Sequence, residues 1–261
     1  MVDFTLLNIF SPANIIVFMA IFVRIGGLLA SAPLYSTYPI PAQVKIWLTA
    51  FIAFILYPIV QAHSQFMIPH DVIGLTCVMI KEFAIGYTIG FCANLVFLAA
   101  ELGANMFSIQ MGLSISQALN PASGAASPII SQAFTLLIAM IFIGLNAHQW
   151  LLSALYSSFA HVPIGYSFIF DGAFVQKVLY MSGQMFAIAI GISMPIFSVL
   201  LIKDILLGFV SKLMPTMNIF MVAMPLKVLV GLLLCMIFLR PTAEYVSAIL
   251  EKILTQISMI F

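Results

Sequence analysis

Long, uninterrupted apolar segments constrain this sequence more than any other feature. A helix needs about 20 consecutive apolar residues to cross the hydrocarbon of a bilayer. The segments of roughly that length lie at 13–32, 42–60, 73–100, 129–153, 178–202 and 222–240, and a short amphipathic tail covers 243–261. Their apolar residues are continuous rather than alternating, which favours helices over strands, and lipid tolerates only helices or closed barrels. The sequence therefore predicts an all-α integral membrane protein.

The scarcity of charge points the same way. Only 7% of the 261 residues are charged, whereas soluble domains carry about 25%. The formal net charge of +1 gives no electrostatic case for binding nucleic acid. Asp3 is present and no basic region precedes the first apolar segment, so we expect no cleaved signal peptide. The basic residues are few and scattered, so the positive-inside rule gives no orientation.

No motif in the sequence predicts catalysis or a cofactor. There is no HExxH motif and no nucleotide-binding glycine-rich loop, so we expect neither a metal nor a nucleotide. Gly112 and Ser114 resemble part of a serine nucleophile turn, but the glycine that should follow the serine is absent, and nothing pairs His148 with Ser114. Cys77, Cys92 and Cys235 lie in apolar runs without CxxC spacing, which favours buried, unreactive thiols.

Charged residues inside the apolar segments have two interpretations. They could form a proton or substrate relay, or they could be helix–helix ion pairs and segment-end charges. A transporter would be helped by related halves, and the sequence shows no convincing internal repeat, so we favour the structural interpretation. Two charges at the centre of a span would cost about 5–7 kcal/mol in lipid, and because the two in 73–100 lie off-centre this is an upper bound. The segment is expected to pack against protein. The residues in question are Arg24, Lys81, Glu82, Glu101, Lys203 and Asp204.

Proline and glycine predict bent, closely packed helices. Pro195, Pro215 and Pro225 lie inside or beside apolar runs, where proline kinks or ends a helix. Gly86 and Gly90 are four residues apart, and this small-xxx-small spacing lets another helix approach closely.

Four methionines recur at helical spacing near residue 220. Methionine is flexible and polarizable, so such a stripe could line an adaptable gate, although ordinary packing is the commoner role. The four are Met214, Met217, Met221 and Met224.

The stretch 103–131 is polar, rich in residues with small side chains, and free of charge. It lies within a longer region, 102–170, that contains no Asp, Glu, Lys or Arg. Backbone of this kind at membrane depth survives only when it is buried in protein or lines an aqueous cavity. Gly112, Pro121 and Gly124 supply turns. The residues alone predict either a re-entrant loop that constricts a pore or a plain extramembrane loop.

Five segments in colinear order carry a resemblance to a known family. They are "RIGGLLASAPLYSTYPIPAQVK" (24–45), "KEFAIGYTIGF" (81–91), "AAELGANMFSIQMGLSISQALNP" (99–121), "LNAHQWLLSALYSSFAHVPIG" (145–165) and "MPTMNIFMVAMPLKVLVGL" (214–232). Together they resemble the FliR family of flagellar export-gate subunits, which has counterparts in virulence type III secretion systems. The resemblance covers nearly the whole chain.

The resemblance implies a non-enzymatic subunit without cofactors in the flagellar basal body of the bacterial inner membrane. Such a subunit assembles with FliP and FliQ, beside FlhB, into a gate through which unfolded flagellar proteins pass. The family fold consists of kinked helical hairpins stacked in a helical assembly. By likeness, 1–175 would be a FliP-like part and 176–261 a FliQ-like hairpin with a C-terminal tail.

The resemblance also implies a plug for the closed pore. In the family, a loop matching 110–123, within about 106–124 of this sequence, projects into the closed channel. Two positions depart from the family pattern. Asn120 stands where an acidic residue is common, and Thr216 stands where Gln is common, so no charge-based gating is expected at Asn120. The matching residues are Gln110, Met111, Gly112, Leu113, Ser114 and Pro121.

Overall fold

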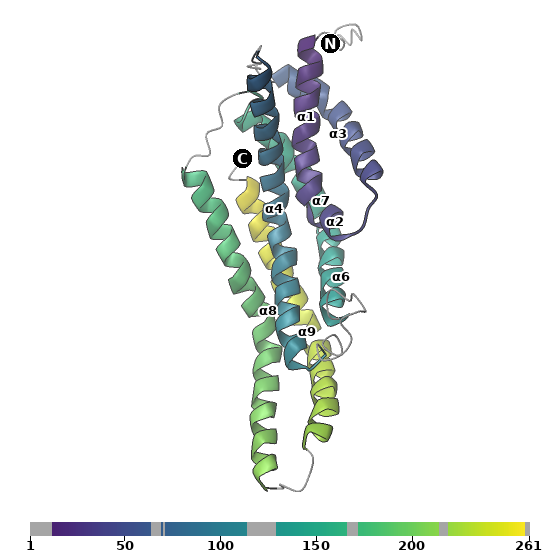
Figure 1. The fold of residues 1–261 in the computed structure, drawn as a ribbon, viewed down its shortest axis with the longest axis vertical. Coiled ribbons are helices and arrows are strands. Elements are labelled where there is room, and N and C mark those ends of the chain that lie inside the picture. Colours follow the sequence, from purple (N-terminus) through teal and green to yellow (C-terminus); the bar gives the residue numbers. More distant parts are fainter. Residues whose placement is uncertain are drawn as a thin grey trace. The chain divides into compact units, whose positions relative to one another are not determined.

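Every regular element in the described part of the chain is an α-helix. The computed structural model describes residues 12–63, 69, 71–113, 129–165, 172–213 and 219–258. The helices, coloured along the sequence in Figure 1, are α1 (Pro12–Ser31), α2 (Pro33–Thr37), α3 (Ala42–His63), α4 (Val72–Gln110), α6 (Ile129–Gly144), α7 (Ala147–His161), α8 (Gly172–Leu213) and α9 (Ile219–Ser258). The predicted all-α fold is confirmed.

Five of these helices are long and apolar enough to cross a membrane, namely α1, α3, α4, α8 and α9. The sixth predicted segment, 129–153, is not one straight helix. It divides into α6 and α7, which meet at an angle of 65°. Asn146 lies at the break with a positive φ of 54°, a conformation that asparagine tolerates better than most residues. The chain is therefore a multi-pass membrane protein, and its described residues contain five helices that could span the membrane, or six spans if the bent pair counts as one.

The helix α4 is longer than the sequence predicts. The expectation that 103–131 is a loop is wrong for its first part, because α4 continues to Gln110. Ala104, Phe107 and Ser108 are completely buried in this extension. Small residues allow close packing here, since a Cβ on Gly103 would lie 2.7 Å from the carbonyl oxygen of Ala189 in α8. The first part of this neutral stretch, 103–110, is therefore a tightly packed helix.

Proline does not end the two longest helices. The helix α8 continues through Pro195, and α9 continues through Pro225 and Pro241, while Pro215 falls outside the described residues. The predicted amphipathic tail at 243–261 is, over its described residues 243–258, the last part of α9. Val246, Leu250 and Ile253 are buried there, at the spacing that places them on one helix face.

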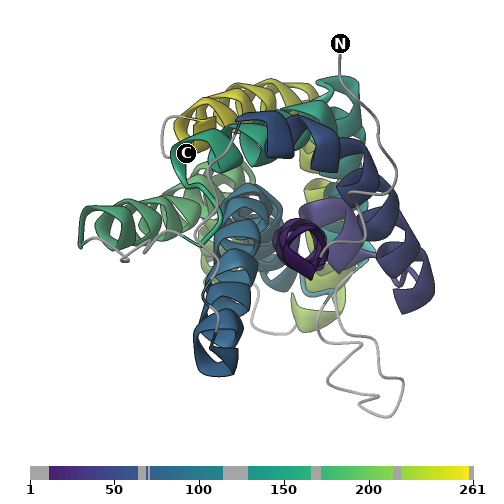
Figure 2. The ribbon, with the colours of Figure 1, turned by 90° about the horizontal axis from the view of Figure 1, so that it is seen from above.

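The chain forms two compact units, and α4 contributes to both. Unit 1 contains the described residues within 1–94, 146–179 and 251–261, and unit 2 contains those within 95–145 and 180–250. In unit 1, α3 lies alongside α1, as both ribbon views show (Figures 1 and 2). The division at residue 175 concerns likeness to other proteins rather than packing, and it stays a prediction.

Candidate functional site

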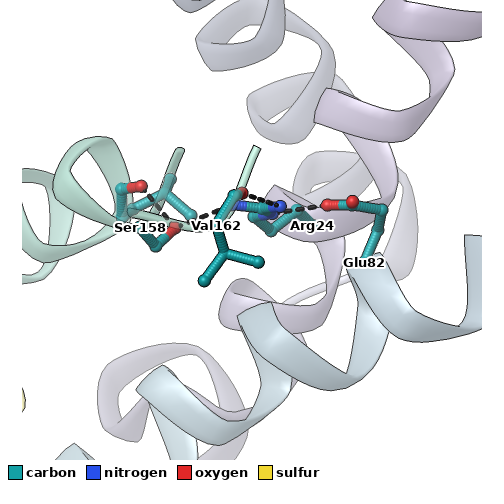
Figure 3. Close-up of polar contacts among 5 residues, drawn as sticks. Arg24, Glu82, Ser158 and Val162 are labelled. Atoms are coloured by element: carbon teal, nitrogen blue, oxygen red, sulfur yellow. Dashed lines mark hydrogen bonds and ion pairs between the residues drawn. The ribbon is translucent and has the colours of Figure 1, made fainter. Parts of the chain in front are cut away.

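Unit 1 buries a complete arginine-centred network. Arg24, in the middle of α1, is fully buried, and its Nε donates to Oε2 of Glu82 in α4 at 2.5 Å (Figure 3). Its two terminal nitrogens donate to Oγ of Ser158 at 3.2 Å and to the carbonyl oxygen of Val162 at 3.0 Å. The ring of Phe159 lies 4.2 Å from the guanidinium carbon, close enough for a cation–π contact. The protein thus supplies the solvation that lipid would deny this charge.

Two glycines explain how the short glutamate side chain reaches the arginine. A Cβ on Gly86, one turn after Glu82, would overlap the carbonyl oxygen of Arg24, and a Cβ on Gly90 would lie 2.6 Å from the carbonyl oxygen of Leu28. The backbones of α1 and α4 are therefore in direct contact along this face. Ser31 extends the contact, since its Oγ donates to the carbonyl oxygen of Tyr87 at 2.8 Å.

The neighbouring charge Lys81 takes no part in this network. Consecutive helix residues point about 100° apart, so Glu82 faces α1 while Lys81 remains partly exposed. Within the part of the chain that the structure describes, Lys81 forms no ion pair. Glu101, further along α4, is half-buried.

In unit 2, α4 ends in a defined capping motif. Gly112 adopts a left-handed conformation with φ of 82°. The N–H of Gly112 donates to the carbonyl oxygen of Ile109 at 2.9 Å, and the N–H of Leu113 donates to that of Ser108 at 3.3 Å. This pair of bonds is the Schellman pattern, which satisfies the last carbonyls of a helix and favours glycine at the left-handed position. We call Gln110–Leu113 the loop root, because the predicted plug begins there.

The start of α6 is packed against the same helix. Oγ of Ser131, near the start of α6, donates to Oδ1 of Asn105 in α4 at 2.6 Å. The rings of Phe107 and Phe134 meet edge to face with centroids 5.3 Å apart. Residues 114–128 therefore connect two helix ends that pack on each other. Ser114, Asn120 and Pro121 lie outside the described residues.

A charged cluster holds the loop root on α8 and α9. Nε2 of Gln110 donates to Oδ2 of Asp204 in α8 at 2.9 Å. Nζ of Lys227 in α9 lies 2.9 Å from the same oxygen, and Nζ of Lys203 lies 2.8 Å from Oδ1. The Lys203 contact is an ion pair without hydrogen-bond geometry, as expected for adjacent side chains that diverge on a helix. Lys227 is not among the residues predicted from the sequence, although a single lysine within the apolar run 222–240 is as unusual as Lys203.

An apolar contact holds the next residue of the loop root. Met111 is completely buried, and its side chain lies over Gly231 of α9. A Cβ on Gly231 would lie only 2.5–2.8 Å from Cγ, Cε and Sδ of Met111. One turn earlier on α4, Sδ of Met106 accepts a weak hydrogen bond from Ser193 of α8 at 3.7 Å. The end of α4 is thus in contact with α6, α8 and α9.

The predicted methionine stripe and the three cysteines take no part in these two networks among the described residues. Met221 is exposed and Met224 is partly exposed, while Met214 and Met217 lie outside the described residues. The expectation of three buried thiols is wrong for Cys77, which is exposed, whereas Cys92 and Cys235 are buried. Among the described residues, no group of three or more His, Cys, Asp or Glu side chains could hold a metal ion.

The described fold is that of a helical, multi-pass membrane protein in which a buried ion pair and a charged cluster join helices. The chain belongs to the family described as "Bacterial export proteins, family 1", whose model matches residues 15–253. It is similar to the flagellar biosynthetic protein FliR of Bacillus subtilis, with 29% identity over 224 residues, covering 84% of this chain and 85% of that protein. It is also similar to FliR of Escherichia coli, with 27% identity over 90% of each chain. FliR of Aquifex aeolicus is 24% identical, over 88% of this chain and 87% of that protein.

Proposed function

We propose that this chain is a core subunit of the flagellar type III protein export gate in the bacterial inner membrane. The observation that carries the proposal is the family match across 15–253, together with similarity over most of the chain to proteins named FliR from distant bacteria. In this role the chain forms a channel with FliP and FliQ, next to FlhB, and unfolded flagellar proteins pass through it. The five apolar helices that can span a membrane support this location.

The two longest helices support assembly with other subunits. At 1.5 Å per residue, α8 and α9, with 42 and 40 residues, are each about 60 Å long, roughly twice the hydrocarbon thickness of a bilayer. Only 33% of the apolar window of α8 and 11% of that of α9 is buried within the chain. Lipid can cover only part of such apolar helices, and neighbouring apolar subunits would cover the rest. This is the behaviour expected of a FliQ-like hairpin following a FliP-like part.

Within this gate, we assign the plug of the resting pore to the neutral loop that follows the loop root. Its lack of charge lets it pack closed without binding passing cargo electrostatically. Its two ends are fixed on packed helices through the Gly112 cap and the Ser131–Asn105 hydrogen bond. A loop with fixed ends can occupy a pore reproducibly, because less conformational entropy remains to be lost when it closes.

Deleting residues 114–120 tests the plug while leaving the capped end of α4 intact. The variant is co-expressed with the other gate subunits, and ion leakage is measured after reconstitution into liposomes. A matched control replaces the same seven positions with a Gly–Ser linker of equal length, to separate loop length from loop sequence. Co-purification of the partner subunits verifies assembly. We expect the deletion to raise leakage, and unchanged permeability in an assembled gate would show that this loop is not the plug.

A further inference from the structure

We propose that Lys227 binds a carboxylate on an apolar helix of a neighbouring gate subunit. This inference rests on the proposed function and deepens it, because it names the chemistry that the partner surface must carry. Lys227 belongs to the cluster around Asp204, which joins α8 and α9 in unit 2. Lys203 and Lys227 both contact the single carboxylate of Asp204, so two positive charges face one negative charge and the cluster has a net charge of +1.

The carboxylate of Asp204 is already required by Lys203. Nζ of Lys203 lies 2.8 Å from Oδ1 of Asp204, and this nitrogen is completely buried within the chain, so a group from another molecule cannot replace Asp204 there. A buried ammonium that loses its counter-charge is strongly destabilising. The side chain of Lys227, in contrast, is 27% exposed. The surplus positive charge is therefore accessible at Lys227.

The chain itself offers no second carboxylate near the cluster. Asp204 is the only acidic residue between 172 and 243, and α6 contains none. Along α4 the next acidic residue is Glu101, about 13 Å before Gln110 on the helix axis. Along α9 the next one is Glu244, about 25 Å beyond the lysine of the cluster. The missing anion must therefore come from another molecule.

Lys227 lies too deep in the apolar band for a lipid headgroup to supply this anion. The exposed charges nearest to the cluster along the two helices are Lys212 in α8 and Arg240 in α9. They lie on opposite sides of it, at roughly 13 Å and 20 Å along the helix axes. Their separation of about 33 Å matches the hydrocarbon thickness of about 30 Å. The carboxylate that reaches Lys227 therefore belongs to protein rather than to a headgroup.

The surface around Lys227 fits an apolar helix. Ala223, Val230 and Leu234 share its face of α9 and are all partly exposed. Only 11% of the apolar window of α9 is buried within the chain. Ionisable side chains inside a membrane pair with one another or with backbone carbonyls. A partner helix that carries one Asp or Glu among apolar residues covers this face and neutralises the ammonium in the same contact.

Lys227→Met tests the proposal in the assembled gate. The tagged full-length chain is co-expressed with FliP and FliQ, and the recovery of both partners is quantified after purification in mild detergent. We expect recovery to fall about tenfold, because an interfacial carboxylate left without its partner weakens a complex by at least that factor. Lys227→Arg keeps the charge and should retain most of the recovery. Lys212→Met removes an exposed lysine at the edge of the apolar band and, as the matched control, should leave recovery unchanged.

Carbodiimide crosslinking of the parent gate identifies the partner group, because the reagent joins an amine to a carboxylate in direct contact. Mass spectrometry should find Lys227 linked to an Asp or Glu of another subunit. The Lys227→Met chain alone should unfold at the parent's SDS fraction, as followed by far-ultraviolet circular dichroism, since Lys203 and Asp204 still neutralise each other.

Three results would overturn this inference while the proposed function stands. The first is unchanged partner recovery with Lys227→Met. The second is unfolding of the isolated Lys227→Met chain at a lower SDS fraction, which would show that the charge is needed within the chain. The third is loss of co-purified anionic phospholipid, rather than of protein partners, from Lys227→Met. If the parent chain recovers neither FliP nor FliQ, the proposed function itself fails, and this inference with it.

Discussion

Removing one member of the Arg24–Glu82 pair should be among the most destabilising single changes in unit 1. Glu82→Ala leaves the guanidinium of Arg24 fully buried without its counter-charge. Breaking a buried ion pair from one side costs about 3–5 kcal/mol of unfolding free energy. Ser158, Val162 and the Phe159 ring still contact the guanidinium, so we expect the low end, about 3 kcal/mol.

Replacing Arg24 instead of Glu82 should lower the free energy of unfolding by more. Arg24→Met fills similar volume but leaves a buried carboxylate that loses its only cationic contact among the described residues, and we expect a cost of about 5 kcal/mol. Ser158 is not left unpaired, because its Oγ also donates to the carbonyl oxygen of Leu155 at 2.7 Å. Glu82→Gln keeps a neutral acceptor and should cost only about 1–2 kcal/mol.

The double variant Arg24→Met with Glu82→Met is the informative control. Well-packed apolar side chains often replace a buried ion pair at little cost, so the double variant should be more stable than Arg24→Met alone. This non-additivity distinguishes an uncompensated charge from a simple loss of packing.

Tryptophan fluorescence during SDS titration of the purified full-length chain in mild detergent provides the measurement. Both tryptophans of the sequence, Trp47 in α3 and Trp150 in α7, belong to unit 1, so the signal reports the unit that contains the ion pair. The reasoning is refuted if Glu82→Ala unfolds at the same SDS fraction as the parent. It is equally refuted if the double variant loses as much stability as the two single variants lose together.

Substitutions at three glycines test the backbone geometry in an SDS titration followed by far-ultraviolet circular dichroism, because Gly112 and Gly208 belong to unit 2, which contains no tryptophan. Gly86→Ala forces a Cβ onto the carbonyl oxygen of Arg24 and should lower the free energy of unfolding by about 1–3 kcal/mol through overpacking. Gly208→Ala, with no atom within 4 Å of the new Cβ, should leave stability unchanged or raise it. Equal effects of the two variants would contradict the close contact of α1 and α4. Gly112→Ala must place a side chain at a φ of 82° and should lower the free energy of unfolding by about 1–2 kcal/mol. Gly112→Asn should lower it by less, because asparagine tolerates the left-handed conformation better. A larger loss for Gly112→Asn than for Gly112→Ala would argue against the left-handed cap.

Much of the helix framework could be predicted from hydropathy alone. The predicted segment at 13–32 differs from α1 by one residue at each end, and the predicted start at residue 42 is that of α3. Both helices follow segments with turn residues, and apolar length is the dominant signal for a helix in lipid. The two charges in 73–100 predicted that this segment packs against protein, and α4 is the most buried of the five helices that could span the membrane.

Tertiary contacts explain what the sequence could not show. The extension of α4 through Asn105 and Ser108 is helical because α6 and α8 cover it, and small polar residues carry no local signal for such burial. The partner of Glu82 was also hidden, since Lys81 is its neighbour in sequence but Arg24 is its neighbour in space. The role of Gln110 depends on Asp204, which lies 94 residues away.

The arginine network also has a consequence for biosynthesis. Ser158 and Val162 follow Arg24 by 134 and 138 residues, so at a synthesis rate of roughly 5–20 residues per second about 7–27 s pass between the appearance of the charge and that of its last partners. During that interval α1 carries a guanidinium whose cost at the bilayer centre is about 2.5–3.5 kcal/mol. Glu82 follows Arg24 by only 58 residues, so the counter-charge is made first, and full solvation of the Arg24 guanidinium waits until α7 has been made.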